Sequence, residues 1–253
     1  MLGKTRAYSR MTLVLGWTVF MFVLRVCAMP IALASRAAER RLRQWLFSEY
    51  ARGVLAITGI DVQVSGRAPD PPFYMVSNHL TFFDVLVLAS RLGCVFVSRA
   101  DLAEWPVLGF ITRHMQTVYI DRDKLKDTVR VNEQIRDRMN KGYGVVVFAE
   151  SKCSEEGTVM PFKPALLQSA VELGLPVHYA SIHYATPDGQ PPASEAVIWK
   201  GETGFVEHYV DVASLSQVQA TITFGEEPIT RSCRKTLAID LHAAVSAVFA
   251  PIK

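Results

Sequence analysis

The sequence predicts an α/β fold with a mostly parallel central sheet flanked by helices, preceded by an N-terminal membrane-associated helical segment. From residue 60 onwards, short runs rich in β-branched and aromatic residues alternate with longer helical patterns, as in strands joined by helical crossovers. One run, GVVVF at 144–148, has no polar alternation and is expected to be a central strand covered on both faces. We expect membrane-anchoring helices over residues 1–58 and an α/β domain over residues 59–253.

Seven strands are expected in the α/β domain. They are the runs at 61–66, 73–78, 94–99, 117–122, 143–150, 177–184 and 220–226. Helical patterns predict helices near 36–59, 83–91, 102–114, 123–141, 164–173 and 231–250. The Pro- and Gly-containing run TPDGQPPASE at 186–195 is expected to be a flexible loop.

Positive charge is concentrated at the N-terminus. Residues 1–45 contain eight Lys or Arg and one acidic residue, Glu39, so their net charge is +7. The remaining residues carry 19 basic and 23 acidic side chains, a net charge of −4. A nucleic-acid-binding domain would spread Lys and Arg over a folded face. The distribution therefore argues against nucleic acid as a partner and favours anionic membrane lipids.

The four cysteines are scattered along the chain. They form no CxxC pair, and no His lies near them at metal-ligand spacing. We expect a reducing compartment, no structural zinc and no metal cofactor.

The N-terminal apolar run leaves its membrane arrangement open. Residues 11–24 carry no charge, and the apolar character continues past Arg25 and Pro30 to residue 35. Fourteen residues are short for a span, whereas the longer run contains a charge and a proline. A tilted span and a half-immersed hairpin both fit, and basic clusters on either side give no orientation. A monotopic anchor at the cytoplasmic face of the inner membrane would satisfy both clusters; a cleaved signal peptide ending near Ala32-Leu33-Ala34 is the alternative.

Polar residues follow three of the predicted strands. His79 and Asp84 come after 73–78, Asp121 and Arg122 end 117–122, and Glu150 ends 143–150. In open α/β sheets, functional groups gather beyond the carboxyl ends of strands. We therefore expect these side chains to face a common site.

The spacing of His79 and Asp84 requires a particular local structure. It is one residue longer than an i, i+4 helical pair, so the side chains meet only where His79 sits in a turn before a helix that begins near Phe82. The pair fits a general base with its orienting carboxylate. Polar residues that merely end a strand would look the same.

Four blocks in this chain resemble the glycerolipid acyltransferases, the family that includes lysophosphatidic acid acyltransferase. That family carries NHxxxxD, a second block ending in Ile-Asp-Arg, a third of the form FPEGTRS, and a later strand beginning near a Pro. Order and spacing agree over roughly residues 70–185. The matching residues are Asn78, His79 and Asp84, then Ile120, Asp121 and Arg122, then Phe148, Glu150 and Ser154, then Leu175, Pro176 and Val177.

The resemblance implies direct acyl transfer from a thioester to a lipid hydroxyl. His79 would be the general base and Asp84 its orienting partner. No nucleophilic Ser or Cys is needed, and the chain has no GxSxG elbow. No cofactor is expected, and acyl-CoA or acyl carrier protein would be the co-substrate. The residues implied to bind substrate are Asn78, Arg122, Glu150, Ser151 and Lys152.

The third block departs from the family pattern. Ala149, Ser151, Lys152 and Cys153 stand where the family has Pro, Gly, Thr and Arg. The missing Arg removes a bidentate phosphate partner, and Lys152 returns the charge without the fork geometry. Sequences resembling lyso-ornithine lipid acyltransferases also lack this Arg, so the expected acceptor is lysophosphatidic acid or lyso-ornithine lipid. A lipid-binding protein without turnover and a lipid hydrolase remain the alternatives.

Overall fold

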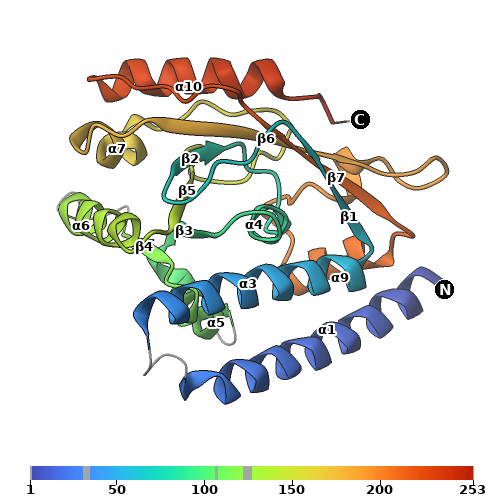
Figure 1. Cartoon of the computed structure of the whole chain (residues 1–253). Coiled ribbons are helices and arrows are strands. Elements are labelled where there is room, and N and C mark those ends of the chain that lie inside the picture. The colour runs from blue at the N-terminus through green and yellow to red at the C-terminus, as the bar shows by residue number, and fades with distance from the viewer. Residues whose placement is uncertain (1, 31–34, 106–107, 122–126, 253) are drawn as a thin grey trace.

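A seven-stranded sheet forms the centre of the molecule in the computed structural model (Figure 1), which describes residues 2–30, 35–105, 108–121 and 127–252. The strand order is β1-β7-β6-β2-β5-β3-β4. Neighbouring strands are parallel except β6 and β7, so the predicted mostly parallel sheet is confirmed. The strands are β1 Ile60–Ser65, β2 Tyr74–Ser77, β3 Cys94–Arg99, β4 Val118–Ile120, β5 Gly144–Phe148, β6 Val177–Ala185 and β7 Val218–Phe224.

Helices cover both faces of the sheet. The run GVVVF forms β5, lies between β2 and β3 and is buried along its whole length, as its lack of polar alternation predicts. One apolar core lies under α3 (Arg36–Thr58), α4 and α9, and a second lies under α6, α7 and α10. The helices of the domain are α4 Phe83–Ala89, α5 Leu108–His114, α6 Asp127–Asn140, α7 Gln168–Glu172, α8 Ala193–Ala196, α9 Phe205–Ser214 and α10 Arg234–Val248, with 3₁₀ turns η1 Ala100–Glu104 and η2 Pro164–Leu167.

The register brings several strand ends to one edge. Ser77 at the end of β2 pairs with Phe148 at the end of β5, and Arg99 at the end of β3 pairs with Ile120 at the end of β4. Because these strands are parallel, the loops that follow them all leave the sheet on the same side. The strand ends that were predicted to carry the site therefore lie at one edge of the sheet.

The helices differ from the sequence-based expectation in two places. The helix expected near 102–114 is divided into η1 and α5, because Trp105 is extended (φ −68°, ψ 133°), as the residue before a proline prefers. The sequence predicts a loop over 186–195, but α8 begins within this run. The helix α9 follows, in a region where the sequence predicts no helix. The first four residues of the helix expected near 123–141 lie outside the described residues.

The N-terminal segment forms a pair of antiparallel helices, α1 Leu2–Cys27 and α3 Arg36–Thr58 (Figure 1). Ser35 caps α3 at its start by accepting from the Ala38 N–H, and Gly59 ends it with a left-handed conformation (φ 87°). Residues of α3, including Phe47 and Leu55, belong to the core beneath the sheet. The expected boundary after residue 58 thus coincides with the end of α3, although α3 shares its core with the α/β domain.

Part of the N-terminal positive charge is used inside the fold. Arg6 donates to the Ser214 carbonyl at 3.1 Å, and Arg10 donates to the carbonyls of Ala213 and Leu215 at 3.0 and 2.7 Å. These carbonyls lie at the C-terminal end of α9, where a helix presents unpaired acceptors and a partial negative charge. Two of the basic residues that the sequence assigns to lipid headgroups therefore dock α1 onto α9.

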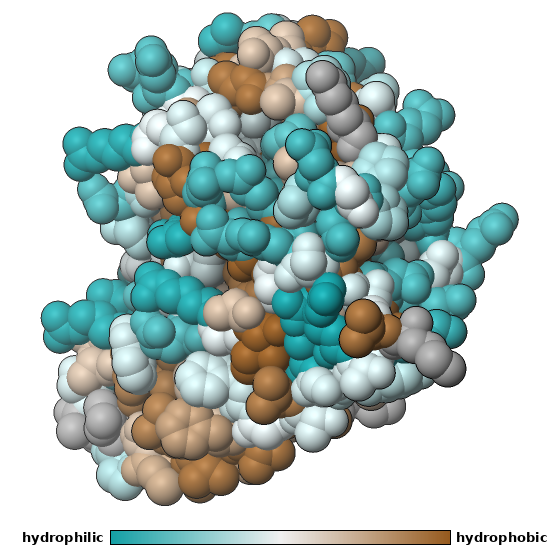
Figure 2. All heavy atoms as spheres, turned by 90° about the vertical axis from the view of Figure 1, so that its right-hand side faces the viewer, coloured by the Kyte–Doolittle hydropathy of each residue, from teal (hydrophilic) through white to brown (hydrophobic). Residues whose placement is uncertain are grey.

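The outer surface of α1 is strongly apolar. Within the described ranges, α1 is the one helix long and apolar enough to cross a bilayer by length and composition. Its exposed side chains include Leu13, Val19, Phe20 and Val23. In Figure 2 hydrophobic side chains gather at the lower end of the molecule, where α1 lies. Such a surface is typical of membrane or protein contact.

Gly53 lies where α1 and α3 pack closely, and its substitution tests that contact. A Cβ at this position would collide with the Trp17 ring, whose Nε1 donates to the Tyr50 carbonyl at 3.2 Å. Helix propensity alone favours Ala over Gly by about 1 kcal/mol, whereas overpacking costs about 1–3 kcal/mol. We expect Gly53→Ala to lower the thermal unfolding temperature in detergent. Gly16→Ala, where a Cβ meets no atom within 4 Å, is the matched control and should keep or raise it; equal behaviour of the two variants would contradict the packing.

Candidate active site

His79 and Asp84 meet through the strand, turn and helix that their spacing requires. β2 ends at Ser77, the chain turns through residues 78–82, and α4 begins at Phe83. His79 Nδ1 lies 2.8 Å from Asp84 Oδ2. The pair that the sequence left open between two interpretations is therefore in direct contact.

Asp84 is fully buried and accepts hydrogen bonds on both oxygens. Oδ2 accepts from His79 Nδ1 and from the N–H groups of Leu80 and Thr81 at 2.6 and 3.0 Å, and Oδ1 accepts from the Tyr184 hydroxyl at 2.8 Å. Since a carboxylate only accepts, the proton of a neutral His79 belongs on Nδ1 and Nε2 is left as an acceptor. Sequence patterns do not predict the contact with Tyr184, because it lies 100 residues further along the chain.

An aromatic stack holds the His79 ring in place. The ring centroids of His79 and Phe148 are 4.0 Å apart, and the two rings form an interplanar angle of 14°. Phe148 stacks in turn on Phe96, with 6.0 Å between their ring centroids. The His79 side chain is 18% exposed, so its ring is fixed on one side and reaches a cavity on the other. Stacking and the bond to Asp84 together restrict the ring to one orientation.

Asn78 is engaged by the neighbouring strand. Its side chain is fully buried, Oδ1 accepts from the Ile182 N–H at 2.7 Å, and Nδ2 donates to the Ile182 carbonyl at 2.9 Å. These bonds fasten the turn after β2 to β6. The observed role of Asn78 is thus to position the turn, while its expected contact with substrate stays a prediction.

A cavity of about 340 Å³ lies in front of His79. Two of the residues expected to bind substrate, Ser151 and Lys152, line it together with Phe148 and Trp199. Asn78, Asp84 and Glu150 are buried and lie outside its lining. Arg122, the expected anion ligand of the second block, lies outside the described residues.

Arg99 also lines this cavity and was missed by sequence reasoning. It ends β3, and its guanidinium binds the Asp101 carboxylate through two contacts of 3.0 and 2.9 Å. The side chain remains 64% exposed. The signal was present, since Arg99 ends one of the predicted strands and strand ends are where functional groups gather.

The loop after β5 closes against the turn that carries His79. The Ser154 N–H donates to the His79 carbonyl at 2.7 Å, and the Lys163 N–H donates to the Ala149 carbonyl at 2.8 Å. Ser151 has a φ of 72°, a conformation that a glycine adopts at little cost and other residues adopt at about 1–2 kcal/mol. Ser151 therefore holds this backbone under strain, whereas a glycine would adopt it at little cost.

Glu150 is a buried carboxyl group. Neither of its oxygens has a hydrogen-bond partner among the described residues. Burial raises its pKa to about 9, opposed by the nearby N–H groups of Met160 and His79, which do not reach hydrogen-bond geometry. At neutral pH Glu150 is therefore a neutral acid that can donate a proton in a hydrogen bond.

Among the described residues, this cavity holds neither a thiol suited to nucleophilic attack nor a metal-binding cluster. Burial and the negative charge of Asp84 raise the pKa of the Cys153 thiol, which disfavours the thiolate needed for attack. No cluster of His, Cys, Asp and Glu suited to a metal occurs within the described part of the chain.

This chain is similar to known acyltransferases. Residues 59–183 match the family model described as Acyltransferase. The chain is 30% identical over 147 residues to the 1-acyl-sn-glycerol-3-phosphate acyltransferase of Neisseria meningitidis, covering 57% of this chain and 58% of that one. It is 27% identical over 239 residues to the lyso-ornithine lipid O-acyltransferase of Rhodobacter capsulatus, covering 89% and 86%.

Residues 59–183 form an acyltransferase-family domain. The match spans little more than half of the Neisseria enzyme.

The whole fold also has a solved counterpart. The crystal structure of the 1-acyl-sn-glycerophosphate acyltransferase from Thermotoga maritima matches with a TM-score of 0.66, covering 96% of this chain and 95% of that one at 19% identity. The shared architecture thus extends beyond the family-model region to α1 and α3. The apolar helix α1 and the lipid acyltransferase relatives together indicate membrane association.

The raised pKa of Glu150 predicts a pH-dependent stability. The unfolded chain ionises Glu150 near its ordinary pKa of 4.5, whereas the folded chain keeps the proton until about pH 9. The contribution of Glu150 to the free energy of unfolding is therefore fully present below pH 4.5. It is lost as the pH rises towards 9, by at most about 1.4 kcal/mol per pH unit. We expect Glu150→Gln to flatten this part of the profile in denaturant unfolding. Glu172→Gln, at an acid on α7, is the control; a wild-type slope in Glu150→Gln would contradict the assignment.

Proposed function

We propose that this protein is a membrane-associated O-acyltransferase that moves a fatty acyl group from acyl-CoA or acyl carrier protein to the hydroxyl of a lysolipid. The observation that carries the proposal is the His79 imidazole, held by Asp84 through Nδ1 and lining a cavity. In this tautomer Nε2 is the acceptor that can take the hydroxyl proton, as a general base does. The acyltransferase-family domain over residues 59–183 supports the same reaction.

The reaction follows from these groups. The acceptor hydroxyl oxygen attacks the thioester carbonyl carbon while His79 Nε2 takes the hydroxyl proton. The tetrahedral intermediate then expels the thiolate. The thiolate receives the proton from the His79 imidazolium, so an ester and a free thiol are formed. Asp84 stabilises the transient imidazolium and keeps Nδ1 as the donor. No acyl-enzyme is involved, which fits the raised pKa of Cys153.

The acceptor headgroup would be held by cations at the cavity. Arg99 and Lys152 line it, and Arg122 is the third proposed ligand. A guanidinium binds phosphate and carboxylate alike, so both lysophosphatidic acid and lyso-ornithine lipid fit this site. Ser151 would contact the same headgroup, and neutral Glu150 would order the acceptor side of the site through a donated hydrogen bond.

The helix pair α1 and α3 would anchor the enzyme. The exposed apolar side chains of α1 would enter the bilayer, at the cytoplasmic face, where the acyl donors are found. The exposed members of the two N-terminal basic clusters, Lys4, Arg36 and Arg41, would then lie on the side of the anionic headgroups.

The first test is acyl transfer by the purified full-length protein in detergent. Labelled acyl-CoA and acyl carrier protein are offered with lysophosphatidic acid, lyso-ornithine lipid and other lysolipids. We expect transfer to one acceptor class, and a loss of about 10²–10⁴-fold in kcat for His79→Ala, the range of a general base. His183→Ala is the matched control, since His183 bonds only the Ala250 carbonyl in the described structure. Undiminished turnover in His79→Ala would refute the base assignment.

The same assay separates the alternatives. Binding of lysolipid without transfer from either donor would support a lipid-binding protein. Release of free fatty acid at a rate independent of acceptor would support hydrolysis.

Lys152 and Arg99 are expected to contribute to the affinity for the acceptor. Replacing either by Gln removes one charge from the cavity and one charge-assisted contact, worth about 1.5–3 kcal/mol. We expect Lys152→Gln and Arg99→Gln to raise KM for the acceptor by about tenfold or more, with little change in kcat or in KM for the donor. Arg67→Gln is the control, because Arg67 is 90% exposed in a surface pair with Asp70. An unchanged acceptor KM in both cavity variants would place the headgroup elsewhere.

A further inference from the structure

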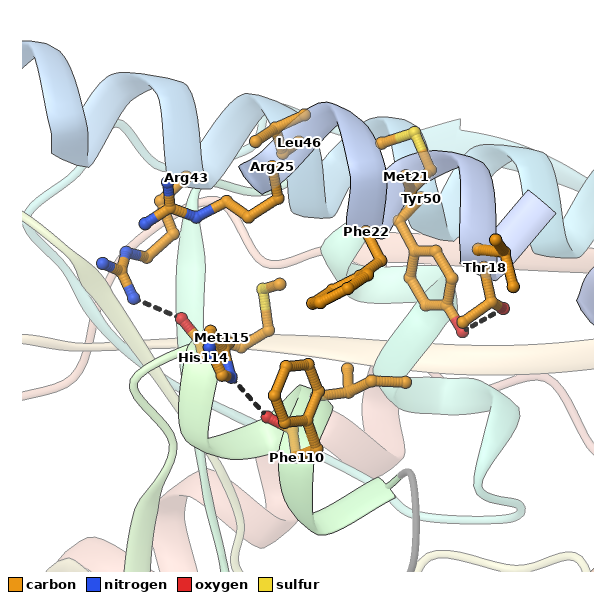
Figure 3. A pocket seen from close by; sticks show the side chains of 12 residues that line it. Thr18, Met21, Phe22, Arg25, Arg43, Leu46, Tyr50, Phe110, His114 and Met115 are labelled. Atoms are coloured by element: carbon orange, nitrogen blue, oxygen red, sulfur yellow. Dashed lines mark hydrogen bonds between the residues drawn. The ribbon is translucent and has the colours of Figure 1, made fainter. Parts of the chain in front are cut away.

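A second cavity lies between α1, α3 and α5 (Figure 3). Its volume is about 210 Å³, and none of the described residues lines both this cavity and the one at His79. The reaction proposed above makes no use of it. Its lining is mostly apolar and includes Met21, Phe22, Leu46, Phe110, Ile111 and Met115.

Three charged residues gather at one end of this cavity. Figure 3 shows Arg25 and Arg43 together at the end opposite Thr18 and Tyr50. Arg25 Nη2 and Arg43 Nη2 both contact Glu39 Oε1, at 2.5 and 2.6 Å. The three side chains are only 14–17% exposed. Two guanidinium groups share one carboxylate, so one positive charge is left over.

The two guanidinium groups that carry the excess charge also have hydrogen-bond donors without a partner among the described residues. Arg25 Nη1 and Arg43 Nε are buried and have no hydrogen-bond partner among the described residues. An unsatisfied buried donor costs about 1–3 kcal/mol, and more when it is charged. Glu39 Oε2 is also unpaired, but it offsets only one of the two cations. An oxyanion between the guanidiniums would satisfy their donors and the net charge together.

The apolar part of the cavity opens towards the apolar surface of the molecule. Val19, Phe22 and Phe110 line it and are 63%, 47% and 40% exposed. Val19 lies on α1 among the other exposed apolar side chains of that helix. The volume is below the roughly 300–1,000 Å³ of pockets that enclose a whole drug-sized ligand. A single alkyl chain that enters from a bilayer and stays partly in it fits this space.

We propose that this cavity is a binding site for a single-chain anionic amphiphile of the membrane. Its oxyanion would bind Arg25 and Arg43, and its chain would lie against the cavity wall formed by Phe22, Phe110 and Met115. Phosphate monoesters and carboxylates share the required chemistry. This proposal does not depend on the proposed acyl transfer.

The test measures equilibrium binding to the full-length protein in an uncharged detergent. The probes are labelled hexadecyl phosphate and palmitate, compared with hexadecanol and inorganic phosphate. We expect one or both anionic amphiphiles to bind at least about tenfold more tightly than either comparison probe, since both charge and chain contribute. The stronger of the two identifies the headgroup. Hexadecanol binding as tightly, or phosphate alone binding as tightly, would overturn the proposal.

Variants locate the site. Arg25→Gln with Arg43→Gln should weaken binding about tenfold or more, whereas Arg41→Gln, an exposed Arg on α3, should not. Ile111→Trp fills the chain region and leaves the ion pairs intact, so it tests the site even where the double variant folds poorly, and it should weaken binding as well. Equal binding by Ile111→Trp and wild type, or a loss in Lys152→Gln instead, would refute this location.

Discussion

The buried carboxylate of Asp84 organises the candidate site. It accepts from His79, from two backbone N–H groups of the turn, and from Tyr184 on β6. A buried carboxylate is tolerated only where such donors replace water. The same bonds therefore shape the turn, orient the imidazole and connect α4 to the sheet. Loss of this carboxylate would loosen the His79 ring and the turn together.

The sheet supplies the rigidity on which this arrangement depends. β2 and β5 end side by side, so Phe148 lies where it can stack on His79. Asn78 joins the turn to β6, and the Ser154 N–H joins the third-block loop to His79. A group fixed by several supports reacts from one geometry, which is what general-base catalysis requires.

Electrostatics differ sharply between the two cavities. At His79, the cations Arg99 and Lys152 are exposed, and Arg99 is shared with Asp101, so a headgroup there can exchange with water. Between α1, α3 and α5, Arg25 and Arg43 are largely buried beside a single carboxylate. Exposed charges interact weakly and buried ones strongly. The same ligand chemistry would therefore be held with different lifetimes at the two places.

The sequence by itself determined the strands, the α/β class and the first block, because alternation, strand-end polar residues and spacing are local properties. The resemblance to the glycerolipid acyltransferases implied Ser151 and Lys152, and both line the cavity at His79. The tertiary structure alone decided that Tyr184 and Arg99 join the site, that Asn78 faces β6, and that Arg6 and Arg10 dock onto α9. Each of these depends on segments that are distant in the chain and adjacent in the fold, and no local pattern encodes such a contact.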